Sequence, residues 1–366
     1  MTARERFCES LLFGKPDRVF LAPGGGREST LAVWHQQGLP EHANYGQLLG
    51  FDPSAGVGLG FRLLPHFEEK VLEVRDGHKI VRDWFGAIVE IDDRYDFSYL
   101  RSARDFVTRK WHKFPVESRA DFPEIKRRLN PAAPERLPPD LETRAREWAS
   151  RDYPLGFGFN GPFWQLREWC GFEGLCMLMM DDPAFVEEMI EFWTEFVSAV
   201  MAPVLRQVSV DSVCISEDMA YKEHSMISPA MARRFLLPAY RRWSEEIHAS
   251  GCRIIDLDSD GRVDELIPVW IEGGINCCSP VEVAAGNDIV AYRREFGRAM
   301  AFRGGIDKRA LAKGGEVMCA ELRRVVPPML ELGGYIPACD HGVPPDISWP
   351  NFCEYVEQLK QLTGWV

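Results

Sequence analysis

Acidic side chains and one distant histidine are the residues whose types and spacing could do chemistry in this sequence. Asp256, Asp258 and Asp260 occupy alternate positions, and His341 lies far along the chain in the segment CDHGVPPD. Carboxylates and imidazole move protons, and both bind zinc, manganese or iron(II). Isolated aspartates also cap helices and shape turns, and a loop histidine can simply be hydrogen-bonded, so these residue types alone leave catalysis, metal binding and structure open.

A wider set of polar residues follows the predicted strands, where parallel α/β barrels keep their chemistry. Its members are Arg27, Asn160, Glu217, Asp218, Ser279, Asp307, Lys308 and Asp340. Glu217 and Asp218 are neighbours at a strand end and point in opposite directions, which predicts one site residue and one structural residue. Lys308 could pair with a substrate carboxylate, although a helix start such as Asp307-Lys308 is usually a cap followed by a solvated cation.

Short β-rich runs alternate with helical patterns along the second half, as in parallel sheets whose strands are joined by crossover helices. Ser228 and Ser348 are predicted helix caps. The predicted strands are 19–22, a run near Val57, 155–159, 212–217, 252–257, 275–278, 300–302 and 335–338. Eight such strands predict a closed (β/α)8 TIM barrel.

An interruption lies between the second and third predicted strands. Residues 70–74 and 79–82 flank Asp76-Gly77, which is a strong hairpin signal, and 88–91 could add another strand. We therefore predict an α/β fold with one TIM-barrel domain over 1–366 that carries a small antiparallel hairpin insertion at about 62–150.

Charge and composition exclude several classes of protein. A formal net charge of −12 argues against a nucleic-acid partner, because phosphate binding needs clustered cations. The N-terminal residues are charged and no apolar run is long enough to span a bilayer, so we expect neither a secretory signal nor a membrane segment and place the protein in the cytoplasm. The 10 cysteines are irregularly spaced, which fits reduced thiols in that compartment.

The second half of the sequence resembles the uroporphyrinogen decarboxylase superfamily, which also contains corrinoid-linked methyltransferases. The resemblance covers most of 155–362 and implies a (β/α)8 barrel enzyme. Two segments carry motifs: GGID with AL at 304–311 resembles the family's Gly-Asn-Leu-Asp and Ala-Leu, and HGVPPD at 341–346 resembles its His-Gly-x-x-Pro-Asp. In addition, 161–169 resembles the third-strand loop of the family, and 228–238 resembles the helix after its fourth strand.

The sequence departs from the decarboxylases after the first strand. Their Arg-Gln-Ala-Gly-Arg motif holds the acidic side chains of the porphyrinogen, whereas this chain reads PGGGR at 23–27 and keeps at most Arg27. Glycine cannot replace the charge-assisted fork that arginine makes with a carboxylate, so the departure argues against strict porphyrinogen decarboxylation.

The sequence also departs from the methyltransferases, which hold zinc with a His-x-Cys pair after the fifth strand and a distant cysteine. The matching positions here are Asp258, Asp260 and His341, with Cys339 two residues before the histidine. Two carboxylates and an imidazole bind zinc, manganese or iron(II), so the resemblance implies a divalent metal site that Glu217 could complete.

The resemblance thus implies a metal-assisted methyltransferase that exchanges a methyl group with a corrinoid-binding partner protein. The implied catalytic residues are Glu217, Asp258 and His341; the implied substrate-binding residues are Arg27, Asn160, Trp169, Ser279 and Lys308; and the implied metal ligands are Asp258, Asp260, His341, Glu217 and Cys339. The alternatives are a tetrapyrrole decarboxylase of porphyrin biosynthesis, in which His341 contacts the substrate, and a non-catalytic binder of corrinoids or small molecules. Relatives include monomers and homodimers.

Overall fold

The computed structural model describes residues 1–102, 104–105 and 107–365. Two compact units make up the chain: the first comprises Met1–Gly58, Asp140–Asn160 and Val204–Val366, and the second comprises Leu59–Pro139 and Gly161–Pro203. The second unit includes 161–203 as well as most of the predicted insertion. No helix among the described residues has the length and apolarity needed to cross a bilayer.

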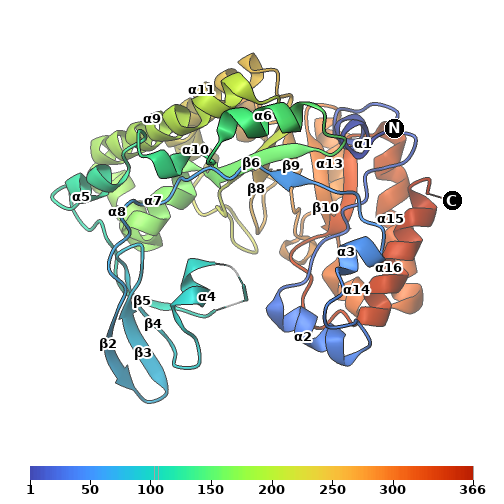
Figure 1. Cartoon of the computed structure of the whole chain (residues 1–366), viewed down its shortest axis with the longest axis horizontal. Coiled ribbons are helices and arrows are strands. Elements are labelled where there is room, and N and C mark those ends of the chain that lie inside the picture. Colours follow the sequence, from blue (N-terminus) through green and yellow to red (C-terminus); the bar gives the residue numbers. More distant parts are fainter. Residues whose placement is uncertain (103, 106, 366) are drawn as a thin grey trace. The chain divides into compact units, whose positions relative to one another are not determined.

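A curled parallel sheet organises the first unit (Figure 1). Its strands, in spatial order, are β1 (Ala55–Gly56), β6 (Leu155–Asn160), β7 (Ser212–Ser216), β8 (Ile254–Asp258), β9 (Cys277–Ser279), β10 (Ala301–Ile306) and β11 (Tyr335–Cys339). Each predicted strand from 155–159 onward coincides with one of these, and the run near Val57 coincides with β1. The α/β class and the parallel arrangement are confirmed, whereas a closed ring of eight strands is not formed among the described residues.

Helices precede, connect and follow these strands. α1 (Ala3–Leu11), α2 (Glu28–Gln36) and α3 (Tyr45–Leu48) come before β1, and α16 (Trp349–Leu362) follows β11. The helices between strands of the sheet are α6 (Leu141–Ala149), α10 (Pro229–Phe235), α11 (Leu237–Ala249), α12 (Ile267–Glu272), α13 (Ile289–Phe296), α14 (Lys308–Lys313) and α15 (Gly315–Leu332). The predicted caps are confirmed, because the Ser228 hydroxyl accepts a hydrogen bond from the Met231 amide at 3.2 Å and the Ser348 hydroxyl accepts one from the Asn351 amide at 3.3 Å.

The two faces of the sheet differ in polarity. One face, the helix face, packs on the crossover helices: Phe159 lies 4.9 Å from the Trp243 ring of α11, and Phe302 lies 6.3 Å from the Tyr292 ring of α13. Its side chains, including Val213, Ile215, Ile255, Leu257 and Phe302, are fully buried. On the opposite face, the inner face, many residues retain solvent contact: Gly158, Asn160, Ser212, Cys214, Ser216, Asp258, Ser279, Arg303 and Ala338.

Helix α1 covers the amino-terminal end of the inner face. Its Phe7 and Leu11 are buried against Ile254, Ala301 and Ile336, which lie near the starts of their strands. Bulky side chains commonly fill barrel interiors, so the polar residues farther along the strands mark a part of the inner face that is not packed as a core.

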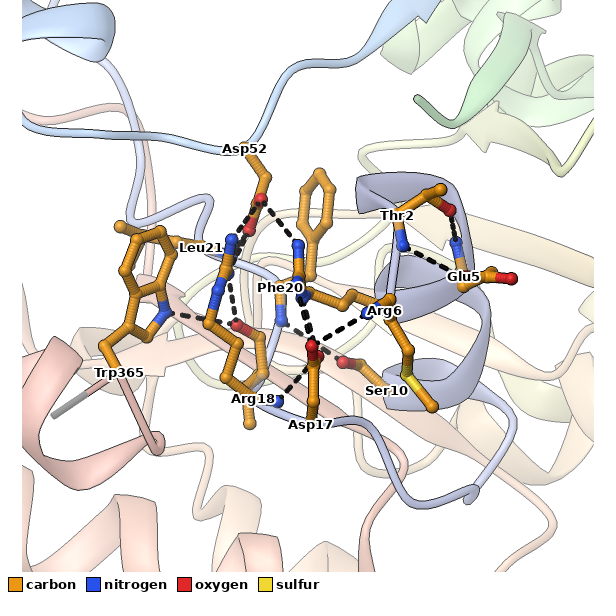
Figure 2. Close-up of polar contacts among 12 residues, drawn as sticks. Thr2, Glu5, Arg6, Ser10, Asp17, Arg18, Phe20, Leu21, Asp52 and Trp365 are labelled. Carbon is orange, nitrogen blue, oxygen red and sulfur yellow. Dashed lines mark hydrogen bonds and ion pairs between the residues drawn. The ribbon is translucent and has the colours of Figure 1, made fainter. Parts of the chain in front are cut away.

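The predicted first strand, 19–22, is not a strand, because other groups take the hydrogen bonds that a ladder would need. The Phe20 amide donates to the Ser10 hydroxyl at 3.3 Å, and the Leu21 amide donates to the Asp52 carboxylate at 2.8 Å (Figure 2). The residues that follow lie beside the end of β11 and its loop at isolated points, since Cys339 N–H donates to Pro23 C=O at 3.0 Å and Gly26 forms a parallel bridge with Val343.

An antiparallel sheet dominates part of the second unit. Its order is β2 (Lys70–Arg75), β3 (His78–Arg82), β4 (Ile88–Asp92) and β5 (Lys110–Lys113). The predicted hairpin is confirmed, and Asp76 and Gly77 both have positive φ, as a tight turn of this kind requires. The helices of this unit are α4 (Phe97–Arg101), α5 (Phe122–Arg128), α7 (Pro162–Cys170), α8 (Phe172–Asp181) and most of α9 (Pro183–Gln207).

Asp83, which follows β3, makes the stability of the second unit depend on pH. Burial raises the pKa of this carboxyl to about 6, although it accepts hydrogen bonds from the Phe85 and Ala87 amides. The folded state therefore holds the proton more tightly than the unfolded chain, and stability falls as pH rises between the unfolded and folded pKa values. Asp83→Asn keeps an acceptor oxygen without the charge.

We expect Asp83→Asn to raise the free energy of unfolding by about 1–2 kcal/mol at pH 7 and to have little effect at pH 4. Thermal unfolding of both proteins across this pH range measures the difference. An equal effect of the substitution at both pH values would contradict the raised pKa.

Candidate active site

A row of four polar positions lies along the carboxyl edge of the sheet on its inner face. Asn160 of β6, Ser216 of β7, Asp258 of β8 and Ser279 of β9 are neighbours in register. Registered residues of parallel strands point to the same face, so these side chains lie side by side. The structure thus brings together three predicted site residues, Asn160, Asp258 and Ser279.

The loops after β8 and β11 bring Asp260 and His341 together. His341 Nε2 lies 3.1 Å from Asp260 Oδ2, within hydrogen-bonding distance, although the residues are far apart in the sequence. This hydrogen bond raises the pKa of the His341 imidazole, while burial acts in the opposite direction. Both side chains are partly open to solvent, so the pair can exchange a proton with a bound molecule.

Hydrogen bonds to the preceding loop fix the position of Asp260. The Asp260 amide donates to the Asp218 carboxylate at 3.2 Å, and the Met219 amide donates to the Ser259 hydroxyl at 3.1 Å. Gly261 follows with φ of +81°, and a Cβ there would lie 2.3 Å from the Ala220 carbonyl oxygen. Only glycine fits this position, where two loops of the site approach each other.

Gly261→Ala is expected to lower the free energy of unfolding by roughly 1–3 kcal/mol, because it adds a backbone clash to an unfavourable φ. Gly286→Ala is the matched control, since Gly286 has φ of +89° but nothing within 4 Å of its added Cβ. Chemical denaturation measures both variants. Equal losses would show that the close approach of the loops contributes nothing.

Asp258 is the residue of this row that carries a carboxyl group. Burial raises the pKa of its carboxyl to about 7, and the charges of Asp256, Asp218 and Asp260 act in the same direction. The Ser216 hydroxyl lies 3.4 Å from its Oδ2 and weakly favours the ionised form. A carboxyl with this pKa is present in both protonation states near neutral pH, as a general acid or base requires.

Arg27 and Lys308 lie at neighbouring loops of the same unit. A Cβ built on Gly342 would lie 3.6 Å from Arg27 Nε, which places this guanidinium beside the His341 loop. Lys308 Nζ donates to Glu282 at 2.7 Å, and its amide donates to the buried Asp340 carboxyl at 3.0 Å. Lys308 therefore joins the loops after β9, β10 and β11, a role that the sequence did not reveal.

A depression of about 510 Å³ opens beside Asp260. It is lined by Ala220, Tyr221, Lys222, Asp260, Gly261, Glu282, Ala284, Ala285 and Arg309. A small molecule in this depression would contact Asp260 and the loops that follow β7, β8 and β9.

Three predicted site residues lie elsewhere. Glu217 is fully buried on the helix side, where its carboxyl accepts a hydrogen bond from Tyr240 of α11. Cys339 is in register with Ile306 and is also buried on the helix face. Trp169 is fully buried in the second unit, with its ring 5.7 Å from that of Phe122. Burial corrects the expectation that these side chains meet a ligand directly.

The predicted metal ligands do not form a three-ligand site as they are placed. Asp260 and His341 contact each other and Asp258 is next to Ser216, while Glu217 and Cys339 face away from the inner face. Among the described residues, no group of three or more His, Cys, Asp and Glu side chains is arranged to hold a metal ion. The arrangement therefore does not fit the metal that the resemblance implies.

The sequence did not reveal Arg303, an inner-face residue, or its pairing with Asp256. Arg303 Nη1 donates to Asp256 Oδ2 at 2.9 Å, and the Ser279 hydroxyl donates to the same oxygen at 3.1 Å. A charged residue inside the otherwise apolar run AFRGGI was the available signal.

A parallel α/β sheet with its polar residues at the carboxyl ends of the strands defines this protein as a barrel-type α/β protein. The family model for uroporphyrinogen decarboxylase (URO-D) matches residues 112–362, and the chain therefore belongs to that family.

A search of curated proteins finds no match to this chain. Among solved structures, a methyltransferase from Methanosarcina mazei is similar over 99% of both chains, with 15% sequence identity and a TM-score of 0.61. At this identity the likeness shows a shared fold.

Proposed function

We propose that this protein is a methyltransferase that exchanges a methyl group between a small methoxylated substrate and a corrinoid carried by a partner protein. The observation that carries the proposal is the hydrogen-bonded pair of Asp260 and His341, at 3.1 Å, beside the polar row of the inner face. Family membership and the similar fold of a methyltransferase support the reaction class.

The pair supplies the proton that a methoxyl leaving group needs. When the methyl carbon passes to the reduced corrinoid as a cation equivalent, the C–O bond breaks and its electron pair stays on the oxygen. His341, whose protonated form Asp260 favours, donates a proton to that oxygen, and solvent restores it. Asp258 lies on the same edge of the sheet and can assist as a second acid.

The test uses the purified protein with reduced cobalamin and a panel of methoxylated aromatic and aliphatic compounds. Methylcobalamin, detected by absorbance, and an equal amount of demethylated product are the expected results. Uroporphyrinogen is incubated in parallel. Formation of coproporphyrinogen, or no methylcobalamin from any donor, contradicts the proposal.

We further propose a divalent metal at this edge of the sheet as a prediction separate from the proton transfer. Binding by Asp258, Asp260 and His341 would require these side chains to move together. Metal analysis of the purified protein, repeated with Asp258→Ala and His341→Ala, tests this point. Stoichiometric zinc, manganese or iron that both variants lose would establish the site, and a metal-free active enzyme would exclude it.

A further inference from the structure

Arg303 is a cation on the inner face, and several of its N–H donors are not used in hydrogen bonds to the described residues. Among the described residues, its guanidinium is hydrogen-bonded only to Asp256, through Nη1. Arginine carries several N–H donors in a planar fork, so most of them remain available. Its side chain exposes 38% of its surface, whereas that of Asp256 exposes 3%. The Arg303 side chain is therefore partly open to solvent.

The surroundings of Arg303 form a built site. Asp256 is held by Arg303 on one oxygen and also accepts a hydrogen bond from Ser279, while its Oδ1 is buried without a hydrogen-bond partner in the described structure. Ile336, which is in register with Arg303 on β11, is buried. Farther along the strands, the inner-face positions Gly158, Cys214, Ser216 and Ala338 are small and retain solvent contact. Small residues toward the carboxyl edge leave room for a ligand on that side of the tethered arginine.

We propose that Arg303 binds a carboxylate group of the substrate on the inner face. Arginine forms charge-assisted, bidentate hydrogen bonds with carboxylates, and Asp256 holds the guanidinium in place for them. This inference rests on the proposed function, because it assigns the substrate class of the same site: a methyl donor that is also a carboxylic acid. Binding at Arg303 would hold such a donor beside Asp258, two residues along β8 from Asp256.

The test compares carboxylates with their neutral amides. Acetate, acetamide, benzoate and benzamide are the probes, and ligand-observed NMR measures their binding to the full-length protein without corrinoid. At least one carboxylate is expected to bind about tenfold or more tightly than its amide. Equal binding of each pair, or no carboxylate binding, overturns the proposal.

The variants must avoid leaving a buried charge unpaired, so Arg303 is removed in a background that lacks the Asp256 charge. Asp256→Asn is expected to strengthen carboxylate binding, because a competitor for the guanidinium is lost. The double variant Asp256→Asn/Arg303→Gln is expected to bind the carboxylate at least about tenfold more weakly than Asp256→Asn. Thermal unfolding confirms that both variants are folded.

Arg233→Gln is the matched control, since Arg233 of α10 has similar exposure and also pairs with one carboxylate, Glu272, away from the inner face. It is expected to leave carboxylate binding unchanged. Unchanged binding in the Asp256→Asn/Arg303→Gln variant refutes the assignment. Because no turnover is measured, carboxylate binding without methyl transfer would overturn the proposed function and leave the Arg303 site standing.

Discussion

His341→Gln is expected to lower the rate constant of methyl transfer by about 10²- to 10⁴-fold, the usual contribution of a general acid. The reason is that glutamine can keep a hydrogen bond to Asp260 but cannot supply a proton to the leaving oxygen. Single-turnover formation of methylcobalamin measures the effect, because substrate binding and product release do not limit that experiment. His248→Gln serves as the control, because His248 lies on α11 and its ring is hydrogen-bonded to the backbone carbonyl of Cys252.

Asp260→Asn separates the charge of the pair from its hydrogen bond. Asparagine keeps an acceptor oxygen for His341, but it lacks the negative charge of Asp260, which also raises the pKa of His341, so the imidazole should deprotonate at lower pH. The alkaline limb of the pH–rate profile should therefore move to lower pH. At pH values below that limb, the loss of rate should be smaller than in His341→Gln. The double variant should be no slower than His341→Gln, because the two residues act as a unit. Additive losses would indicate separate roles.

Pairing of distant loops could be predicted from the sequence because parallel strands share one carboxyl edge. That rule alone places Asn160, Asp258 and Ser279 along a row. It also predicts that loops following β8 and β11 lie at the same edge, where Asp260 and His341 meet. The sequence therefore indicates that Asp260 and His341 lie at the same edge of the sheet, but it does not give the distance between their side chains.

The face on which each side chain lies could not be predicted, because it depends on register. Glu217 follows Ser216, an inner-face residue, so the alternation of side chains turns its carboxyl toward Tyr240. Cys339 follows Ala338 in the same way. Arg303 was missed for another reason: the predicted strand ended at 302, whereas β10 continues to Ile306.

The predicted first strand failed because apolar periodicity does not reveal competing side-chain acceptors. The run at 19–22 is apolar and lies beside the sheet, yet Ser10 and Asp52 accept from its amides. Such long-range side-chain bonds carry no local signal, and a segment held by them does not need a β ladder.

Asp52→Ala is expected to lower the free energy of unfolding by about 3–5 kcal/mol, the cost of removing one partner of a buried ion pair. The Asp52 carboxylate is almost fully buried, accepts two hydrogen bonds from Arg18 at 2.6 and 2.7 Å, and also holds the Leu21 amide (Figure 2). Chemical denaturation measures the loss. The substitution leaves the Arg18 guanidinium without its bidentate acceptor in a partly buried position.

Asp17→Ala is the control that distinguishes a buried acceptor from an exposed one. Asp17 also binds an arginine, Arg6, through two hydrogen bonds, but its side chain is open to solvent, so a much smaller change is expected.

Asp52 holds the segment that continues to Arg27, beside the loop of His341. Asp52→Ala should therefore also increase amide hydrogen exchange at Cys339 and Val343, which donate to Pro23 and Gly25. Unchanged exchange at these amides would show that the contacts with the last strand hold the segment without Asp52.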